Sequence, residues 1–324
     1  MKTFNEIQQL ITAELEQINL KKAPCGLYNP ISYILQLGGK RIRPALTLMA
    51  CNLFSENIAA AVKPAVGIEI FHNFTLLHDD IMDKADVRRG KATVHKKWNE
   101  NTAILSGDGM QIIAYQYISE VETAKLKSVL DVFSQTAIEV CEGQQYDMDF
   151  ESSETITVGE YFEMIRLKTA VLLGGALKIG ALIGGATEED AQLLYDFGIG
   201  IGLAFQLKDD LLDTYGDEKT FGKKIGNDIL CNKKTFLLTS ALEKASDEKK
   251  TELQACLQIP VEQAEEKIQS VIAIYNDLNV KAMCEEQINK FYLSAIEQLE
   301  KVQVENSRKQ ELKQLAEKLM FRED

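Results

Sequence analysis

The stretch PAVGIEIFHNFTLLHDDIMD, residues 64–83, decides the fold class. Its apolar residues recur at helical spacing and cover more than one face, which predicts a helix at the centre of the fold. Only 5 of the 324 residues are proline, and this favours long uninterrupted helices. Further helices are expected at 4–18, 31–37, 44–54, 101–119, 122–149, 158–183, 188–215, 227–245, 261–277, 280–301 and 304–319. No segment alternates like a strand, so the sequence predicts one all-α domain over residues 1–324.

The charge balance is acidic, since 36 Lys and Arg stand against 49 Asp and Glu, a net charge of −13. Such a surface repels a phosphate backbone, which argues against nucleic acid as a partner. The six cysteines form no C-x-x-C pair and indicate reduced thiols. The N-terminus lacks a signal peptide's apolar core, and no apolar stretch reaches the roughly 18 residues of a membrane span. The longest, around 170–185, is expected to be a buried helix. We therefore expect a soluble, cytoplasmic protein without a membrane span.

Two aspartate-rich clusters, DDIMD (79–83) and DDLLD (209–213), carry the chemistry. In each cluster the first and last aspartates are four residues apart, so both carboxylates project from one face of a helix. Aspartates at helix C-termini also oppose the helix dipole. A single cluster could be merely solvated, but two with the same spacing favour a divalent cation that relieves the repulsion. Mg²⁺ suits carboxylates that leave positions for water and phosphate oxygens.

Cationic segments stand beside both clusters. GGKRIRP (38–44) places three cations on a glycine-hinged turn, and RRG (88–90) follows the first cluster. GKK (222–224) and KKT (233–235) follow the second cluster. Arg forks and Lys point charges are what diphosphates require. In an acidic protein, this arrangement predicts a metal-bridged polyphosphate as the ligand.

These segments resemble one family, the trans-type isoprenyl diphosphate synthases, or polyprenyl synthetases. The matching motifs, in order, are GGKRIRP (38–44), HDDIMDKADVRRGKATVH (78–95), GDGM (107–110), EGQQYD (142–147), KTA (168–170), FQLKDDLLDTYGDEKTFGKKIGND (205–228) and NKKT (232–235). The resemblance implies a single large bundle of helices around a central active-site cavity. It also implies a homodimer with three Mg²⁺ ions in each active site.

The resemblance assigns roles position by position. The metal ligands would be Asp79, Asp83 and Asp209, with Asp80, Asp210 and Asp213 ligating or directly behind them. The allylic diphosphate would be held by Arg88, Lys168, Thr169, Gln206, Lys223 and Lys233, of which Lys168, Thr169 and Gln206 also serve catalysis. Isopentenyl diphosphate would be bound by Lys40, Arg43, His72 and Arg89, with Gln144 and Asp147 in supporting positions. Lys223 and Lys224 compete for one position, and the G-K-x-x-G spacing favours Lys223.

The implied reaction is head-to-tail prenyl transfer from an allylic diphosphate (dimethylallyl, geranyl or farnesyl) to isopentenyl diphosphate. Metal ions and cations would stabilise the charge on the leaving oxygen. Two other functions stay open. A class I terpene cyclase also uses an aspartate-rich helix end, but it needs no isopentenyl site, so Lys40, Arg43 and the second cluster argue against it. A non-catalytic subunit of a heteromeric synthase should have lost aspartates, whereas both clusters are complete.

Product length is expected to depend on the helix that carries Asp79. Thr75, four residues earlier, is small, and Phe74 lies about 7.5 Å down the helix axis and is bulky enough to close the channel. Phe71 would form a second floor, and His78 is expected only to pack. A sequence with an aromatic residue five positions before the cluster and a small residue next to it resembles the C20 synthases of the family. Geranylgeranyl diphosphate is therefore the expected product and farnesyl diphosphate the alternative, although Phe74 could instead merely pack against a neighbouring helix.

Overall fold

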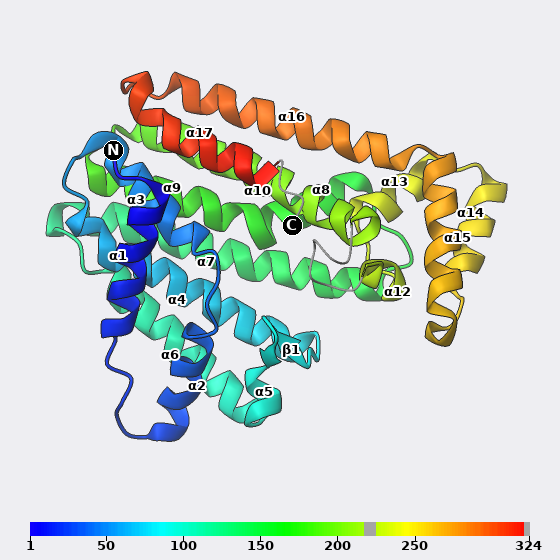
Figure 1. Cartoon of the computed structure of the whole chain (residues 1–324), viewed down its shortest axis with the longest axis horizontal. Coiled ribbons are helices and arrows are strands. Elements are labelled where there is room, and N and C mark those ends of the chain that lie inside the picture. Colours follow the sequence, from blue (N-terminus) through cyan, green and yellow to red (C-terminus); the bar gives the residue numbers. More distant parts are fainter. Residues whose placement is uncertain (217–224, 321–324) are drawn as a thin grey trace. The chain divides into compact units, whose positions relative to one another are not determined.

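The computed structural model describes residues 1–216 and 225–320, and it confirms the all-α class (Figure 1). The helices are α1 (Phe4–Gln17), α2 (Cys25–Leu35), α3 (Ile42–Phe54), α4 (Ala59–Met82), α5 (Val94–Lys97), α6 (Glu100–Ile118), α7 (Thr123–Ser152), α8 (Val158–Ile165), a π-helical turn (Arg166–Ala170), α9 (Val171–Gly184), α10 (Glu188–Tyr215), α12 (Asn227–Leu230), α13 (Phe236–Lys244), α14 (Asp247–Leu257), a 3₁₀ turn (Val261–Gln263), α15 (Ala264–Asp277), α16 (Val280–Lys301) and α17 (Asn306–Met320). Two short strands, β1 (Val87–Arg88) and β2 (Lys91–Ala92), form an antiparallel hairpin.

The chain divides into two compact units. The first comprises Met1–Thr136, Gly175–Tyr195 and Lys301–Leu312, and the second comprises Ala137–Gly174, Asp196–Glu300 and Lys313–Asp324. The two aspartate clusters therefore belong to different units. The prediction of a single domain over residues 1–324 stays a prediction.

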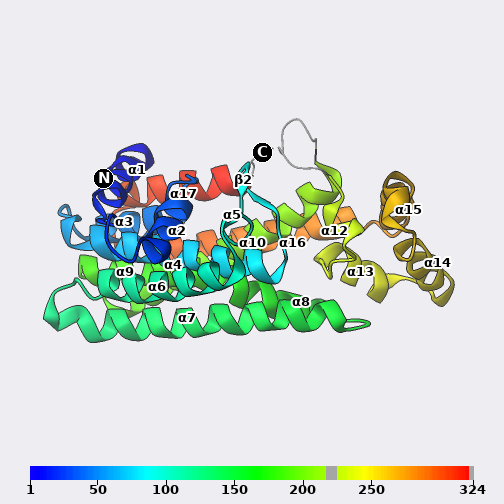
Figure 2. The ribbon, with the colours of Figure 1, turned by 90° about the horizontal axis from the view of Figure 1, so that it is seen from below.

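The central element of the first unit is α4, as the sequence predicts. Of its 24 residues, 13 are buried, all of them between Ala61 and Asp80, and they include the charged Glu69. Gly67 lets α6 approach closely, because a Cβ at this position would lie 2.9 Å from Ile118 Cγ1 and 3.0 Å from the Ala114 carbonyl oxygen. The two helices run side by side in both views (Figures 1 and 2). Near the last turn of α4, where the first cluster begins, His78 lies against Gly107 of α6, where an added Cβ would come within 2.6 Å of His78 Cδ2.

The second unit is built on α10 and α16. Gly200 of α10 lies against α16, where an added Cβ would come within 2.8 Å of Ala295 Cβ and 3.0 Å of the Phe291 carbonyl oxygen. Further along α10, Leu207 is buried and its carbonyl oxygen accepts a weak hydrogen bond from Cys284 Sγ at 3.7 Å. The end of α10, which carries the second cluster, is thus fixed from one side by α16.

The helix predictions are wrong in three places. Helix α2 begins at Cys25 rather than at residue 31, because Pro30 removes only one backbone hydrogen bond near the start of the helix. The predicted helix 227–245 is two helices, α12 and α13, separated where Asn232 adopts a φ of 53°. Thr235 then caps α13 by accepting a hydrogen bond from the Leu238 N–H. Helix α14 was not predicted, although Ser246 caps it in the same way.

One segment, Val158–Gly184, is long and apolar enough to cross a membrane by length and composition alone. This corrects the expectation that no apolar segment reaches that length. Within the apolar window, 78% of the residues are buried inside the protein, as expected for a core segment. The same segment was predicted as one continuous helix, but the π-helical turn Arg166–Ala170 interrupts it.

Candidate active site

The first aspartate cluster lies at the C-terminal end of α4, in the first unit. Asp79 and Asp80 belong to the last helical turn, and Asp83 is the C-cap residue. Asp79 and Asp83 are therefore one turn apart, as the spacing predicts. The Asp80 side chain is only 3% exposed, whereas the Asp79 side chain is 20% exposed and Asp83 is exposed. Asp79 and Asp83 are thus the more accessible ligands for a cation.

Arg88 neutralises the buried Asp80. Its Nε donates to both carboxylate oxygens, at 2.8 and 2.9 Å, and its Nη2 lies 2.8 Å from Asp80 Oδ1. The same Nη2 is 3.7 Å from Asp79 Oδ2. Burial raises the pKa of Asp80, and the hydrogen bonds from Arg88 oppose that shift. Arg88, which the sequence assigns to the allylic diphosphate, therefore also holds the first cluster in place.

A tight hairpin carries Arg88 and its neighbour Arg89. The turn residues Arg89 and Gly90 have φ values of 51° and 72°, and positive φ at both positions is typical of a two-residue hairpin turn. Val87 pairs with Ala92 across the hairpin. The segment between α4 and α5 thus contains a short hairpin that fixes the direction of both arginines.

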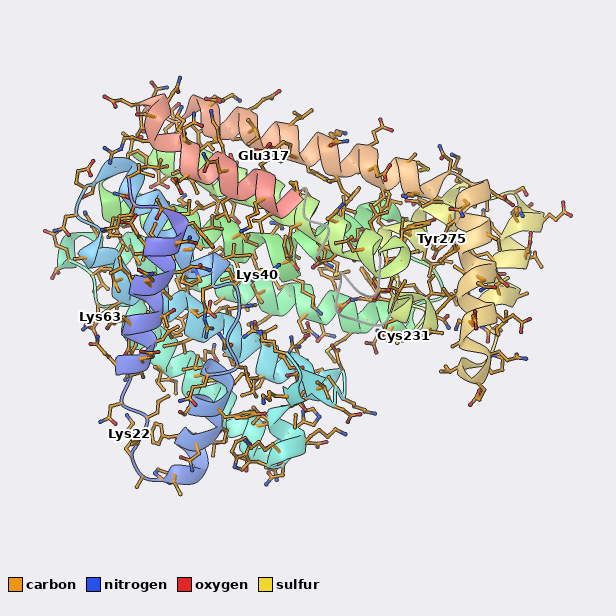
Figure 3. All side chains as sticks on the ribbon, viewed as in Figure 1. Lys22, Lys40, Lys63, Cys231, Tyr275 and Glu317 are labelled. Atoms are coloured by element: carbon orange, nitrogen blue, oxygen red, sulfur yellow. The ribbon has the colours of Figure 1, made fainter. Side chains whose placement is uncertain are left out.

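The glycine-hinged turn packs against Arg89. Gly38 and Gly39 have φ values of 82° and 132°, which favour glycine. A Cβ at Gly39 would lie 2.9 Å from Arg89 Cζ, so the guanidinium sits directly on this glycine. Arg89 Nη1 also donates to the Gly38 carbonyl oxygen. Lys40, labelled in Figure 3, follows on the same turn with an exposed side chain, and its carbonyl oxygen accepts a 2.6 Å hydrogen bond from Gln8.

Arg41 anchors this turn to the core of the first unit. It adopts a φ of 51°, forms an ion pair with Glu69, and donates to the Leu35 carbonyl oxygen at 2.7 Å. Glu69 is 2% exposed and also accepts a hydrogen bond from Asn73 at 2.9 Å. The sequence analysis gave Glu69 no role. The sequence feature that could have indicated a role for Glu69 is its place as a lone carboxylate in the middle of an apolar helix, because a buried charge needs a partner.

Arg43 and His72 form the centre of the predicted isopentenyl diphosphate site. Arg43 Nη1 lies 3.2 Å from His72 Nε2, and because a guanidinium can only donate, Nε2 is the acceptor. Burial, Arg43 and Arg89 hold the pKa of His72 well below its usual range. Burial also lowers the pKa of Arg43 to about 10, so Arg43 stays charged at neutral pH. The buried Arg43 Nε has no hydrogen-bond partner, and it is a donor that an anion would satisfy.

The predicted chain-length residues form part of a column of aromatic rings. Phe74 is 7% exposed and Phe71 is fully buried, with ring centroids 5.5 Å apart. Phe74 also contacts the His78 ring at 4.7 Å, and Phe71 contacts Phe133 of α7 at 5.2 Å. The Thr75 hydroxyl donates to the His72 carbonyl oxygen at 2.8 Å. The aromatic partners of Phe74 thus belong to its own helix α4, and its role as a floor stays a prediction.

The second aspartate cluster lies at the end of α10, in the second unit. Asp209 is half-buried, whereas Asp210 is only 3% exposed. Asp210 accepts hydrogen bonds from the Tyr161 hydroxyl at 2.6 Å and from Gln206 Nε2 at 3.1 Å. Burial and the charge of Asp228 raise the pKa of Asp210 to about 6. Asp209 is therefore the more accessible of the two for a cation.

Asp213 ties the end of α10 to α12. Its Oδ2 accepts the Asp228 N–H at 2.9 Å, and its carbonyl oxygen accepts the Gly226 N–H at 2.6 Å. Lys233, on the connection between α12 and α13, has an exposed side chain, and its charge acts on Asp210. The predicted Lys223, and Lys224 beside it, lie outside the described residues. Asp213 thus connects α10 to α12, in addition to its predicted role as a metal ligand or a residue directly behind the ligands.

The π-helical turn Arg166–Ala170 positions Lys168 and Thr169. A Cβ at Gly143 of α7 would lie 2.6 Å from Lys168 Cα, and a Cβ at Gly202 of α10 would lie 2.5 Å from Ala170 Cα. Only glycine permits such close backbone contact on both sides of the turn. Single π turns often occur at functional sites. The family motif EGQQYD therefore contains a glycine that the π turn requires.

Hydrogen bonds orient the side chains of this turn. Lys168 Nζ lies 2.5 Å from Asp147 Oδ2. The predicted supporting residue Asp147 therefore forms an ion pair with Lys168, which is predicted to bind the diphosphate. The Thr169 hydroxyl donates to Gln206 Oε1 at 3.3 Å. Gln144 is half-buried on α7, three residues before Asp147. In the second unit, the structure thus brings together Asp147, Lys168, Thr169 and Gln206.

The donor chemistry of both clusters fits Mg²⁺. Over residues 1–216 and 225–320, no three His, Cys, Asp or Glu side chains converge closely enough to hold an ion by themselves. Mg²⁺ is ordinarily bound by one or two carboxylates, with waters and substrate phosphates completing its coordination. Asp79 with Asp83, and Asp209 in the second unit, provide such hard oxygen donors. Asp80 and Asp210 are better placed to support them.

Comparison with known proteins identifies the family. The chain matches the polyprenyl synthetase family model over residues 25–275. It is 42% identical over 236 residues to the geranylgeranyl diphosphate synthase of Methanosarcina mazei, covering 72% of this chain and 73% of that protein. It is 43% identical over 228 residues to the short chain isoprenyl diphosphate synthase of Methanocaldococcus jannaschii, covering 70% and 69%. A crystal structure of a geranylgeranyl pyrophosphate synthase matches 100% of both chains, with a TM-score of 0.94 and 43% identity. The chain belongs to the polyprenyl synthetase family.

Proposed function

We propose that this protein is a prenyltransferase that condenses isopentenyl diphosphate head to tail with an allylic diphosphate, and that its main product is geranylgeranyl diphosphate. The family membership and the similarity to short-chain synthases support the reaction. The observation that carries the proposal is the unpartnered Nε of Arg43, held beside neutral His72. A donor left without a partner in a cationic cluster is suited to a diphosphate oxygen.

The residues of the chain divide the work of this reaction. Asp79, Asp83 and Asp209 would hold Mg²⁺, which supplies charge stabilisation to the leaving diphosphate when bound. Lys168, oriented by Asp147, would bind oxygens of the same diphosphate. As the allylic group ionises, the oxygens of side chains such as Thr169 would stabilise the developing cation.

The acceptor side is served by the first unit. Arg43, Lys40 and Arg89 would bind isopentenyl diphosphate, and neutral His72 adds no further charge to the site. The double bond of isopentenyl diphosphate attacks the allylic cation, and the released pyrophosphate takes the proton. The product is five carbons longer. We propose that three Mg²⁺ ions serve each active site and that turnover requires them.

We also propose that the protein is a homodimer. Helix α6 exposes Leu105 and Ile112, which are 60% and 62% exposed and seven residues apart on one face, with Ile104 beside them at 44%. Large apolar side chains grouped on one helix face are typical of an interaction surface. Light scattering of the wild-type protein and of a Leu105→Glu, Ile112→Glu variant tests this, because the variant should have half the mass.

A cytoplasmic location is the last part of the proposal. All six cysteines are free, and Cys51 and Cys284 are buried. Burial raises the pKa of the Cys51 thiol to about 11, so it is inert at neutral pH. Free thiols are typical of a reducing compartment.

The product length rests on Phe74. Its ring is packed among Phe71 and His78, and such a buried ring on α4 is held firmly enough to stop a growing chain. Thr75 is small and leaves the first turn below Asp79 open. These features support a C20 product over the C15 alternative.

Incubation with labelled isopentenyl diphosphate, Mg²⁺ and each allylic diphosphate, followed by chain-length analysis, tests the function. Wild-type protein should give mainly C20 product. Phe74→Ala should lengthen it by at least one C5 unit, and Thr75→Phe should shorten it toward C15. Phe54→Ala, a half-buried phenylalanine at the end of α3, is the matched control and should leave the product unchanged. An unchanged distribution in Phe74→Ala would place the floor elsewhere, and no incorporation by the wild type would reject prenyl transfer.

A further inference from the structure

A buried chain of hydrogen bonds in the second unit begins at a residue that the family motifs do not include. Tyr161 of α8 is 1% exposed, and its hydroxyl donates to Asp210 Oδ2 at 2.6 Å. A hydrogen bond of this length to a carboxylate is among the stronger ones in proteins. Tyr161 therefore fixes the position of the second aspartate of the DDLLD cluster.

The chain continues from Asp210 to the π-helical turn. Asp210 Oδ1 accepts a hydrogen bond from Gln206 Nε2 at 3.1 Å, and Gln206 Oε1 accepts one from the Thr169 hydroxyl at 3.3 Å. An ionised carboxylate can only accept, so it requires the NH₂ group of Gln206 on its side. The Gln206 carbonyl oxygen must then point toward Thr169. The direction of the Gln206 amide is thus decided by Asp210.

We propose that Tyr161 is a positioning residue for prenyl transfer: by holding Asp210, it sets the direction of the Gln206 carboxamide and of the Thr169 hydroxyl. The inference rests on the function proposed above. It also gives Asp210 a different task from Asp209, because both of its carboxylate oxygens already bind side-chain donors. Without the Tyr161 hydroxyl, a carboxylate that is 3% exposed loses a donor and turns to find another.

The test is Tyr161→Phe, which removes one oxygen and keeps the ring. We expect kcat to fall by ~10- to 100-fold, since a hydrogen bond to a charged group is lost. The KM for isopentenyl diphosphate should change less than twofold, because the residues assigned to it lie in the first unit. The matched control is Tyr275→Phe: Tyr275, labelled in Figure 3, is also a buried tyrosine of the second unit, at 2% exposed. It should keep the wild-type kcat.

Repeating Tyr161→Phe in a Gln206→Met variant shows whether the Tyr161 hydroxyl positions Gln206 or only stabilises the packing. Gln206→Met removes the amide and preserves the length of the side chain, so adding Tyr161→Phe to it should lower kcat little further. Thermal unfolding of both tyrosine variants shows whether their stabilities differ. An equal loss of kcat in the two tyrosine variants, or a full additional loss in the Gln206→Met background, would overturn the proposal.

Asp210→Asn provides an independent route if Tyr161→Phe gives no soluble protein. The asparagine has the same shape, but its NH₂ group can face Gln206 and reverse the amide, so kcat should again fall by ~10- to 100-fold. Wild-type kcat in Asp210→Asn overturns the inference. A wild-type enzyme that forms no prenyl product rejects the proposed function instead, so the two failures are distinguishable.

Discussion

Replacing Gly143 by alanine should move the π-helical turn and with it the side chains of Lys168 and Thr169, to which we assign catalytic roles. The new Cβ would lie 2.1 Å from the Lys168 backbone nitrogen and 2.6 Å from Lys168 Cα, whereas ordinary van der Waals contact begins at 3.4 Å. Relieving the shortest of these contacts requires a displacement of about 1.3 Å, and the atoms involved are backbone, which cannot rotate away. A misplacement of about 1 Å can lower the rate by ~10²-fold. Overpacking of this kind destabilises by about 1–3 kcal/mol.

The assay is prenyl transfer at a temperature well below the unfolding midpoint of the variant, together with denaturant unfolding. Gly159→Ala is the matched control in the same unit, because its Cβ would meet only Thr157 Oγ1, at 3.8 Å. Gly159 lies inside helix α8, so alanine there should stabilise by about 0.5–1 kcal/mol and leave kcat unchanged. If Gly143→Ala retained kcat within twofold of the wild type, the close packing would not be what positions Lys168.

Three further predictions concern charge. The pKa of His72 is depressed below its unfolded value near 6.5. Its contribution to the free energy of unfolding is therefore complete above pH 6.5 and declines as the pH falls toward the folded-state pKa, by at most ~1.4 kcal/mol per pH unit. His72→Gln should flatten that decline, and an unfolding free energy with the same pH dependence as the wild type would contradict the assignment. Asp79→Ala and Asp209→Ala should each reduce kcat by orders of magnitude, and turnover should cease in excess chelator; full activity without divalent metal would exclude the metal mechanism. Arg43→Ala should mainly raise the KM for isopentenyl diphosphate, and Lys233→Ala should mainly raise the KM for the allylic substrate. If either variant raised both KM values equally, the two sites would be assigned wrongly.

Local features of the site could be predicted from the sequence. Asp79 and Asp83 are one helical turn apart because their spacing alone decides it. The family resemblance assigns Arg43 and His72 to one site, and the structure places Arg43 Nη1 3.2 Å from His72 Nε2. In these cases the relevant information lies within one helix or within a recognisable motif.

Contacts between distant segments could not be predicted in this way. Arg41 and Glu69 are 28 residues apart, and Tyr161 and Asp210 are 49 apart. Each residue by itself is an ordinary arginine, glutamate or tyrosine, and only the packing of helices decides which of them meet. The π turn depends likewise on Gly143, whose small size matters only because another backbone lies against it.

The unequal pairing of the arginines in the first unit has a consequence for how much enzyme a cell retains. Arg41 and Arg88 each have a carboxylate partner, whereas among the described residues Arg43 and Arg89 have none. A diphosphate bound as proposed would supply the missing anion, and at a hundred times its dissociation constant it would stabilise the folded chain by about 2.7 kcal/mol. That is a large share of the roughly 5–15 kcal/mol that keeps a protein folded. On this proposal, a scarce five-carbon precursor would leave the protein more easily unfolded and degraded, so that precursor supply would affect enzyme lifetime as well as flux.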